Sequence, residues 1–378
     1  MKENKLKKLF SNQLFATTIA LILGFIVSGF VLLAIGKNPI SVYIGMFSGV
    51  FGNPRNIAET IIKATPIIIT GASIAFAFKT GLFNIGAEGQ YIVGFVAAGI
   101  VGILVDLPSI IQIPLLLIVG MVAGMLFGGL SGLLKAKFGV HEVISGIMLN
   151  WIAFYLQMYV SLSSPLFIKE TSGTAPINVS GQIKLFAAQK AAGDYSELVK
   201  VPVIGPILGR TDINYGIFVA LIVIFVLHFI IKKTTLGYQL RAVGFNKHAA
   251  EFAGINVNKN IIRSMAIAGA VAGLAGAVNI MAISPHKINS IAMFENYGFD
   301  GLSVALMAGS SIPGVVLSSL LFSILKIGGN VMQLNTGAPS ELISVLIGII
   351  IFFIALANIL PVLADKIASR KVKEKKNE

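Results

Sequence analysis

Two acidic residues stand beside long apolar runs of this chain. Glu88 lies in the segment 79–90, and Asp300 lies in the segment 296–302. A carboxylate next to apolar spans is costly, and it usually has a role in transport or in structure. The chemistry open to such residues is polar contact with a solute or the binding of a coupling ion.

The segment 79–90 combines Glu88 with residues that favour irregular backbone. Its three glycines permit a tight conformation, while Asn84 and Gln90 can satisfy freed backbone groups. Irregular backbone inside a bilayer is tolerated only where protein or a water-filled cavity covers it. We therefore predict a broken or re-entrant helix near 79–90 that faces a pathway. Glu88 could instead complement the dipole of the helix that follows, from an aqueous loop.

A second segment of interest lies within residues 232–263, where six basic residues accompany the single acid Glu251. Asn246 can cap a short helix and Gly254 can end it, which encloses about two turns. Lys and Arg near span ends favour the cytoplasmic side of a membrane, so we place this loop inside the cell. The short helix suits either docking onto a partner protein or resting on anionic lipid, and the residues alone leave both open.

The sequence offers no enzymatic site. It contains no G-x-x-x-x-G-K-[ST] loop for nucleotide phosphates, no cysteine, and no metal-ligand spacing among its four dispersed histidines. We therefore expect no catalytic residue, no cofactor and no metal in this chain. Energy for transport would have to come from an ion gradient or from a separate ATPase subunit.

The elements that position these residues follow from composition. Of 378 residues, 56% are hydrophobic and 12% are charged, whereas a soluble domain carries about 25% charged residues. These values exclude a soluble enzyme, a disordered regulator and a disulfide-stapled secreted module. The net charge of +13 lies mostly in the tails and at the ends of apolar runs, as in a membrane protein rather than a nucleic-acid-binding surface. The predicted fold class is all-α, a polytopic transmembrane helical bundle.

Nine stretches between positions 9 and 364 lack charged residues, and most are long enough to cross a bilayer. Both basic ends of the chain should be cytoplasmic, which requires an even number of crossings. Nine is an odd number, so one further crossing is expected. It is best placed in 301–333, where Ser310, Ser311 and Pro313 can divide the apolar run into a half-helix and a second helix. We expect about ten spans, with a second broken helix near 298–313.

The domain organisation follows from these assignments. Residues 1–13 form a cytoplasmic N-terminal tail, 14–364 a single transmembrane domain, and 365–378 a basic cytoplasmic tail. Within the domain, 169–212 is expected to be an extracytoplasmic loop and 232–263 a cytoplasmic one.

Glycines recur at helical spacing in two of the apolar runs. Gly120, Gly124, Gly128 and Gly132 fall on one face of a helix, and Gly269 and Gly273 repeat the spacing. Helices in a membrane associate through close contact that small residues permit, so we expect these faces to be helix–helix seams. Hinges for transport are the alternative.

Four segments of the chain, in order, carry a family resemblance. They are GLFNIGAEGQ at 81–90, RAVGFNKHAAEFAGI at 241–255, the alanine- and glycine-rich run 266–278, and GFDGLSVA at 298–305. Together they resemble the permease family of ABC importers for branched-chain amino acids and simple sugars, most closely its nucleoside-importer branch. The resemblance covers about residues 60–350 and is weaker for substrate than for family.

The resemblance implies a permease subunit in a bacterial cell membrane that forms a translocation path for nucleosides with a second homologous permease. A cytoplasmic ABC ATPase would bind and hydrolyse ATP, so this chain would not be an enzyme. An extracytoplasmic substrate-binding lipoprotein would deliver the solute. Its contact with the loop 169–212 is one reading, and a tolerated insertion is the other.

The resemblance also implies roles for particular residues. The segment that matches a coupling helix would contact the ATPase through Arg241, Gly244, Asn246, Ala249, Ala250 and Gly254. As a hypothesis, the substrate pathway is lined by Asn84, Glu88, Asn150, Trp151, Tyr155 and Asp300. Trp151 could stack on a nucleobase, or it could merely mark the membrane interface.

Three alternatives remain open at the level of sequence. A simple-sugar ABC permease would share most of these features. An ion-coupled secondary transporter would use Glu88 and Asp300 as proton or sodium sites and would need no ATPase. A scaffolding subunit would move nothing.

Overall fold

The computed structural model describes residues 13–168, 172–186, 211–336 and 340–357, together with residues 189, 200, 205 and 207. The described chain is helical except for connecting segments, one 3-10 turn, η2 (Val179–Gly181), and a small antiparallel hairpin of β1 (Phe167–Ile168) and β2 (Gly173–Thr174). Its contacts divide it into two compact units, one formed by Pro54–Ser323 and one by the residues before and after that range.

The unit formed by the two ends of the chain contains α2 (Gln13–Ala34), α3 (Pro39–Phe51), α17 (Ser340–Ala357) and the second half of α16 (Gly314–Thr336). The side chain of Asn38 caps α3 by accepting from the amide of Ile40 at 3.0 Å. The connection bends the chain by 119° between the two helices. The two helices therefore form either one broken span or a re-entrant pair.

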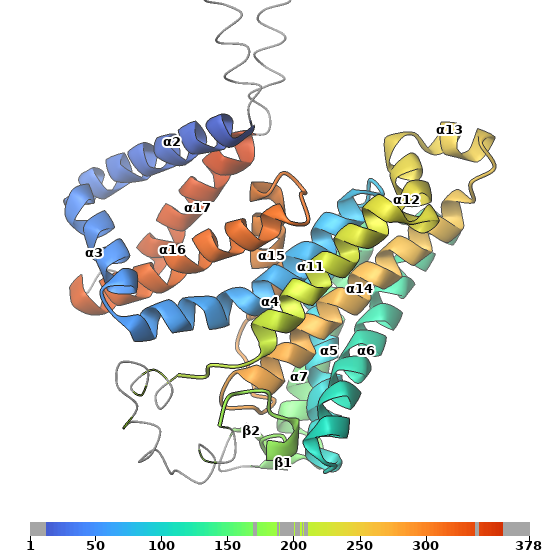
Figure 1. Ribbon diagram of the computed structural model, residues 1–378, viewed down its shortest axis with the longest axis horizontal. Coiled ribbons are helices and arrows are strands. Elements are labelled where there is room, and N and C mark those ends of the chain that lie inside the picture. The colour runs from blue at the N-terminus through green and yellow to red at the C-terminus, as the bar shows by residue number, and fades with distance from the viewer. Residues whose placement is uncertain are drawn as a thin grey trace, which may run out of the picture. The chain divides into compact units, whose positions relative to one another are not determined.

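The unit Pro54–Ser323 is built around one helix, α14 (Val257–Ala282), which is buried along most of its length. It packs against three long helices, α4 (Pro54–Phe78), α5 (Ala87–Leu104) and α6 (Ser109–Phe138) (Figure 1). The unit is completed by α7 (Glu142–Leu162), α11 (Gly216–Lys233), α12 (Thr235–Phe245), α13 (Lys247–Phe252), α15 (Tyr297–Met307) and the start of α16.

The helices of this unit run between two ends. The hairpin β1–β2 lies at one end, and α12 and α13 lie at the other (Figure 1). We call these the hairpin end and the α13 end. The helices α4, α6 and α11 run toward the α13 end, and α5, α7 and α14 run away from it.

Seven helices of the described residues are long and apolar enough to cross a membrane, and the bent α2–α3 pair would make an eighth span. The prediction of an all-α polytopic membrane bundle is therefore confirmed. The number of about ten spans stays a prediction, because the last apolar stretch, which ends at 364, is described only as far as Ala357. The tails 1–12 and 358–378 and most of the predicted loop 169–212 lie outside the described residues.

The predicted glycine seam is confirmed between α6 and α14. Gly120, Gly124, Gly128 and Gly132 are all buried on one face of α6. A methyl group at Gly124 would come within 2.7 Å of the Cα of Gly273, and one at Gly128 within 2.8 Å of the Cα of Gly269. The two backbones therefore touch without intervening side chains, as lipid-embedded helices require.

The predicted break near 298–313 is confirmed. α15 has 11 residues, too few to span, and ends at Met307, while α16 begins at Gly314. Between them Gly309 and Ser310 both adopt left-handed backbone, with φ of 56° and 57°. Two successive left-handed residues reverse the chain and cannot continue a helix.

The prediction of a broken helix near 79–90 needs correction. The backbone is irregular over 79–86, but it connects α4 and α5, each of which is long enough to span on its own. Gly81 makes the turn with a φ of 70°, and Leu82 anchors it because its side chain is fully buried. The segment is thus a buried connection at the α13 end rather than an interruption inside one span.

Candidate functional site

Glu88 lies in the first turn of α5 and is fully buried. Its Oε1 accepts from the amide of Asn296 at 2.9 Å, and its Oε2 accepts from the amide of Gly298 at 2.5 Å. These amides open α15, where backbone N–H groups have no partner within the helix. The carboxylate therefore caps a helix 210 residues away in sequence, from its place in the first turn of α5.

Asn150, on α7, satisfies the backbone of the segment next to Glu88. Its Oδ1 accepts from the amide of Gly89 at 2.8 Å, and its Nδ2 donates to the carbonyl of Ile85 at 3.1 Å. Asn84 and Gln90 were expected to do this work. Instead their side-chain amides pair with each other, at 2.9 and 3.0 Å.

A further polar group beside Glu88 was missed by the sequence analysis. The hydroxyl of Tyr91 donates to Glu295 Oε2 at 3.0 Å and accepts from the side chain of Asn279. The ring of Tyr91 lies 5.3 Å from that of Tyr297. One sequence signal could have pointed to this group: Glu295 is an acidic residue directly before the segment 296–302 that contains Asp300.

Aromatic side chains gather at the α7 side of this region. Trp151 lies 4.9 Å from Phe294 and 6.1 Å from Tyr155, measured between ring centroids. Trp151 is 46% exposed and Tyr155 65% exposed, whereas Phe154 behind them is buried. Asp300 is half-buried in the first turn of α15. The predicted pathway residues thus divide into a buried group (Asn84, Glu88 and Asn150) and an exposed aromatic pair.

At the α13 end, the predicted short helix is present as α13. Asn246 Oδ1 accepts from the amide of Ala249 at 3.1 Å and so caps the start. The helix ends at Phe252, and Gly254 stops it as expected: it has a left-handed φ of 79° and donates its amide to the carbonyl of Glu251 at 2.9 Å. Both caps were readable from sequence because they depend on local residue types.

The predicted contact residues of this region do not all face outward. Asn246, Ala249 and Gly254 are exposed, and Arg241 is half-buried, with its Nε donating to the carbonyl of Gly237 at 3.4 Å. Ala250 is only 3% exposed, so we correct its assignment: it packs inward and supports the helix.

Two phenylalanines dominate the exposed surface of the same region, and the sequence analysis did not single them out. Phe245 ends α12 and is 90% exposed, and Phe252 ends α13 and is 95% exposed. Gly244, beside Phe245, lies against the connection between α4 and α5. A methyl group there would come within 3.0 Å of the carbonyl carbon of Lys79.

The family model for the permease component of branched-chain amino acid transport systems matches residues 56–355. The chain belongs to this permease family. The match begins at the start of α4 and includes all the predicted pathway and coupling residues.

Similar proteins cover the permease almost from end to end. It is 41% identical over 344 residues to the guanosine ABC transporter permease protein NupP of Bacillus subtilis, which covers 91% of this chain and 93% of NupP. It is 36% identical over 357 residues to the nucleoside ABC transporter permease protein NupB of Lactococcus lactis, which covers 94% of each chain. The glucose ABC transporter permease protein TsgB13 of Haloferax volcanii is 30% identical over 87% of this chain and 83% of its own. No solved structure matches the permease.

Proposed function

We propose that this permease is the transmembrane subunit of an ABC importer that moves nucleosides across a bacterial cell membrane. The two nucleoside relatives are more similar to it than the glucose relative, and both cover nearly its whole length. ABC transporters take their energy from ATP, and this sequence has no phosphate-binding loop. ATP is therefore bound and hydrolysed by a separate ATPase subunit.

The charges of the helix ends support an orientation for this subunit. The α13 end carries Lys79, Lys135, Lys137, Lys232, Lys233, Arg241, Lys247, Lys259 and Arg263. Basic residues next to spans stay in the cytoplasm, so this end faces the ATPase and both termini lie on the same side. The hairpin end then faces outward, toward a lipid-anchored protein that delivers the nucleoside.

The observation that carries the proposal is the exposed pair Phe245 and Phe252, the last residues of α12 and α13 at this basic end. Water-exposed aromatic side chains of this size are typical of surfaces that another protein covers. Phe252 is the last residue of α13, and Phe245 directly precedes Asn246, which caps the start of α13, so the two residues flank this helix. The helix thus suits insertion into a cleft of an ATPase better than contact with lipid alone.

In the proposed importer, the solute path lies beside the exposed face of α7. Trp151 and Tyr155 offer flat surfaces on which a nucleobase can stack. Trp151 contacts Phe294, which in turn contacts Phe299, the residue before Asp300 on α15. The buried residues Asn84, Glu88 and Asn150 shape the wall behind. A second homologous permease completes the path, and loose binding suffices because tight binding would trap the solute.

The docking proposal is tested with the double variant Phe245→Ala/Phe252→Ala, purified with its ATPase from a detergent extract. We expect ATPase recovery to fall at least tenfold, because buried aromatic anchors contribute about 2 kcal/mol each to an interface. Phe138→Ala is the matched control: Phe138 is 71% exposed at the same end of the unit, on α6. Undiminished recovery of the ATPase with the double variant would overturn the assignment.

Substrate and energy source are tested together in vesicles that contain the complete importer. We expect ATP-dependent uptake of guanosine, and no uptake of guanosine from an imposed ion gradient without ATP. Uptake of glucose in preference to nucleosides would favour the sugar permease that the TsgB13 relationship suggests. Uptake driven by the ion gradient alone would instead favour a secondary transporter.

A further inference from the structure

We propose that the connection between α4 and α5 transmits movement of the α12–α13 region to the half-helix α15, and that Glu88 is the positioning residue at the receiving end. This inference rests on the proposed function, since it requires an ATPase that moves the α13 end. The route is a series of contacts within the unit Pro54–Ser323 that leads from Gly244 to Gly298.

The first step of this route is a contact between two backbone segments. Gly244 lies against residues 79–81 so closely that a methyl group on it would come within 3.1 Å of the amide of Gly81. In return, a methyl group on Gly81 would lie 3.5 Å from the Cα of Gly244. Asn246, two residues after Gly244, caps α13. A displacement of α13 therefore acts directly on the connection, with no flexible side chain between them.

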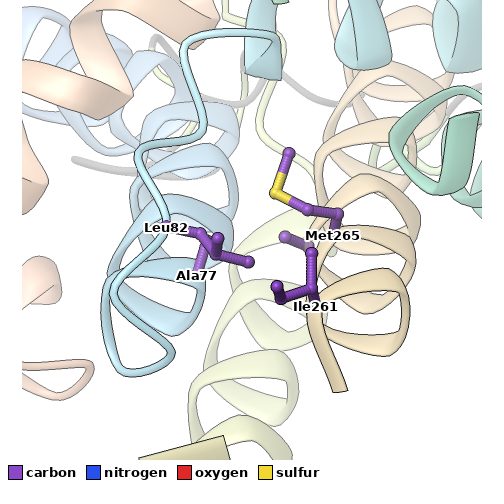
Figure 2. Packing of buried hydrophobic residues seen from close by; sticks show 5 residues of the cluster. Ala77, Leu82, Ile261 and Met265 are labelled. Carbon is purple, nitrogen blue, oxygen red and sulfur yellow. The ribbon is translucent and has the colours of Figure 1, made fainter. Parts of the chain in front are cut away.

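The connection is held too firmly to absorb such a displacement. Leu82 and Ala77 pack against Ile261 and Met265 of α14, where the four side chains point toward one another (Figure 2). The hydroxyls of Thr80 and Ser264 share a hydrogen bond of 2.8 Å. The connection and the first turns of α14 thus form one packed block.

Polar bonds continue this block as far as Glu88. Asn150 fixes the backbone on both sides of the start of α5, and the Asn84–Gln90 pair spans the same turn. These side chains are all buried. Buried hydrogen-bonded networks of this kind are rigid, because breaking one bond leaves a polar group unsatisfied.

At the receiving end, Glu88 holds the start of α15. This helix follows the non-helical stretch 283–296 and precedes the left-handed turn at Gly309 and Ser310, so it can shift without distorting a longer helix. Its first turn is attached to α5 by the two bonds of Glu88 and to α4 by Thr70, whose hydroxyl donates to the carbonyl of Tyr297 at 2.9 Å.

A carboxylate is the side chain that this position requires. Both oxygens of Glu88 accept from backbone amides, and an ionised acceptor strengthens each bond. Glutamine has the same length but offers one oxygen and one NH₂ group. In Glu88→Gln, one amide of α15 would therefore face another donor, and α15 would lose its firm link to the block.

The test uses the complete importer in vesicles, with ATP hydrolysis and guanosine uptake measured in the same sample. For Glu88→Gln we expect guanosine moved per ATP hydrolysed to fall at least tenfold. Ser73→Ala is the control, because Ser73 donates an equally buried bond from α4 to the carbonyl of Ala268 on α14, and this bond links neither helix to α15. We expect this control to keep the wild-type ratio.

A second variant acts at the other end of the same route. In Gly244→Ala, the added methyl group would push on Lys79 and Gly81, so we expect the ratio to fall here also. Gly244 is exposed, so its neighbours can adjust to a methyl group more easily than the buried partners of Glu88 can adjust to glutamine. If Glu88→Gln lowers the yield of folded protein, the ratio of guanosine moved to ATP hydrolysed in Gly244→Ala tests the inference instead.

The outcomes separate the two proposals. A wild-type ratio in Gly244→Ala, or in folded Glu88→Gln, would overturn the inference, and so would an equal fall in Ser73→Ala. Failure of the proposed function would look different, because the wild-type complex would then fail to bind the ATPase or to move guanosine at all.

Discussion

The seam between α6 and α14 and the junction between α5 and α15 both bring backbones together at glycines, but only the junction adds a buried carboxylate. At the seam, glycine faces bring two backbones into direct contact, and the attraction is van der Waals packing. At the junction, the carboxylate of Glu88 accepts hydrogen bonds from two amides at the start of the short helix α15. Packing at the seam fixes two spanning helices against each other, whereas the bonds at the junction tie the short helix α15 to α5. The comparison teaches where the bundle is fixed and where it can move.

The largest predicted effect tests the fixed region. In Gly124→Ala, the methyl group would overlap the backbone of Gly269 and Gly273, so the two helices must separate. We expect a loss of about 3 kcal/mol in the free energy of unfolding, at the upper end of the range for overpacked cores. Thermal unfolding of the purified permease in detergent measures it.

The control for that prediction lies one turn further along α6. A methyl group at Gly129 would find its nearest neighbour, the Cβ of Ala266, at 3.7 Å, which is an ordinary contact. Gly129→Ala should therefore leave the stability unchanged or slightly raise it, because alanine favours helix. Equal losses in the two variants would mean that the glycine face is not a seam.

The second prediction tests the polar contacts beside the junction, through Asn150, which joins α7 to the start of α5. Asn150→Leu keeps the branching and the number of side-chain heavy atoms but leaves the amide of Gly89 and the carbonyl of Ile85 without their partner. We expect a loss of about 2 kcal/mol, since each abandoned buried group costs roughly 1–3 kcal/mol before the structure relaxes. The measurement is again thermal unfolding in detergent.

Gln157→Leu on the same helix is the matched control. Gln157 is equally buried, but it donates one bond, at 3.3 Å, to the carbonyl of Asn289. We expect about half the loss seen for Asn150→Leu, because one group is abandoned rather than two. A larger loss in Gln157→Leu would locate the critical polar contact nearer the hairpin end.

The two regions also differ in how well the sequence predicts them. The glycine spacing of α6 and the caps of α13 are local patterns, so the seam and the short helix could both be predicted. The role of Glu88 could not, because its partner Gly298 is 210 residues away and takes part through its backbone. Any residue type but proline can supply an amide, so the partner leaves no signature in the sequence.

Exposure was a further limit of sequence reasoning. Ala250 and Ala249 are adjacent and chemically identical, yet Ala250 is buried and Ala249 is exposed. Only the direction of α13 decides which of them faces a partner. Phe245 and Phe252 were passed over for a related reason: in so apolar a chain, two more phenylalanines give no signal until their exposure is known.

The smallest predicted effect concerns a similar carboxylate contact at the hairpin end. Asp212 Oδ2 accepts from the amide of Ser284 at 2.9 Å, and its Oδ1 accepts from the hydroxyl of Ser284 at 2.9 Å. Burial alone would raise the pKa of Asp212, but these bonds and the charge of Lys184 outweigh it and lower the pKa. A carboxyl with a lowered pKa stabilises the folded state above its unfolded pKa of about 3.9 and loses that contribution as pH falls.

We therefore expect Asp212→Asn to cost about 1 kcal/mol near neutral pH, and the difference from wild type to shrink as the pH falls through the lowered pKa of Asp212. Asp106→Asn is the control at the same end, where one carboxylate oxygen accepts from the hydroxyl of Ser180 at 2.6 Å. Thermal unfolding between neutral and acidic pH measures both. Asp212 lies outside the spanning helices, where water can replace a lost partner, whereas the groups around Glu88 are shielded by protein. A loss in Asp212→Asn as large as that in Asn150→Leu would show that the strength of the polar contacts at the start of α5 comes from the bonds alone and owes nothing to their buried position.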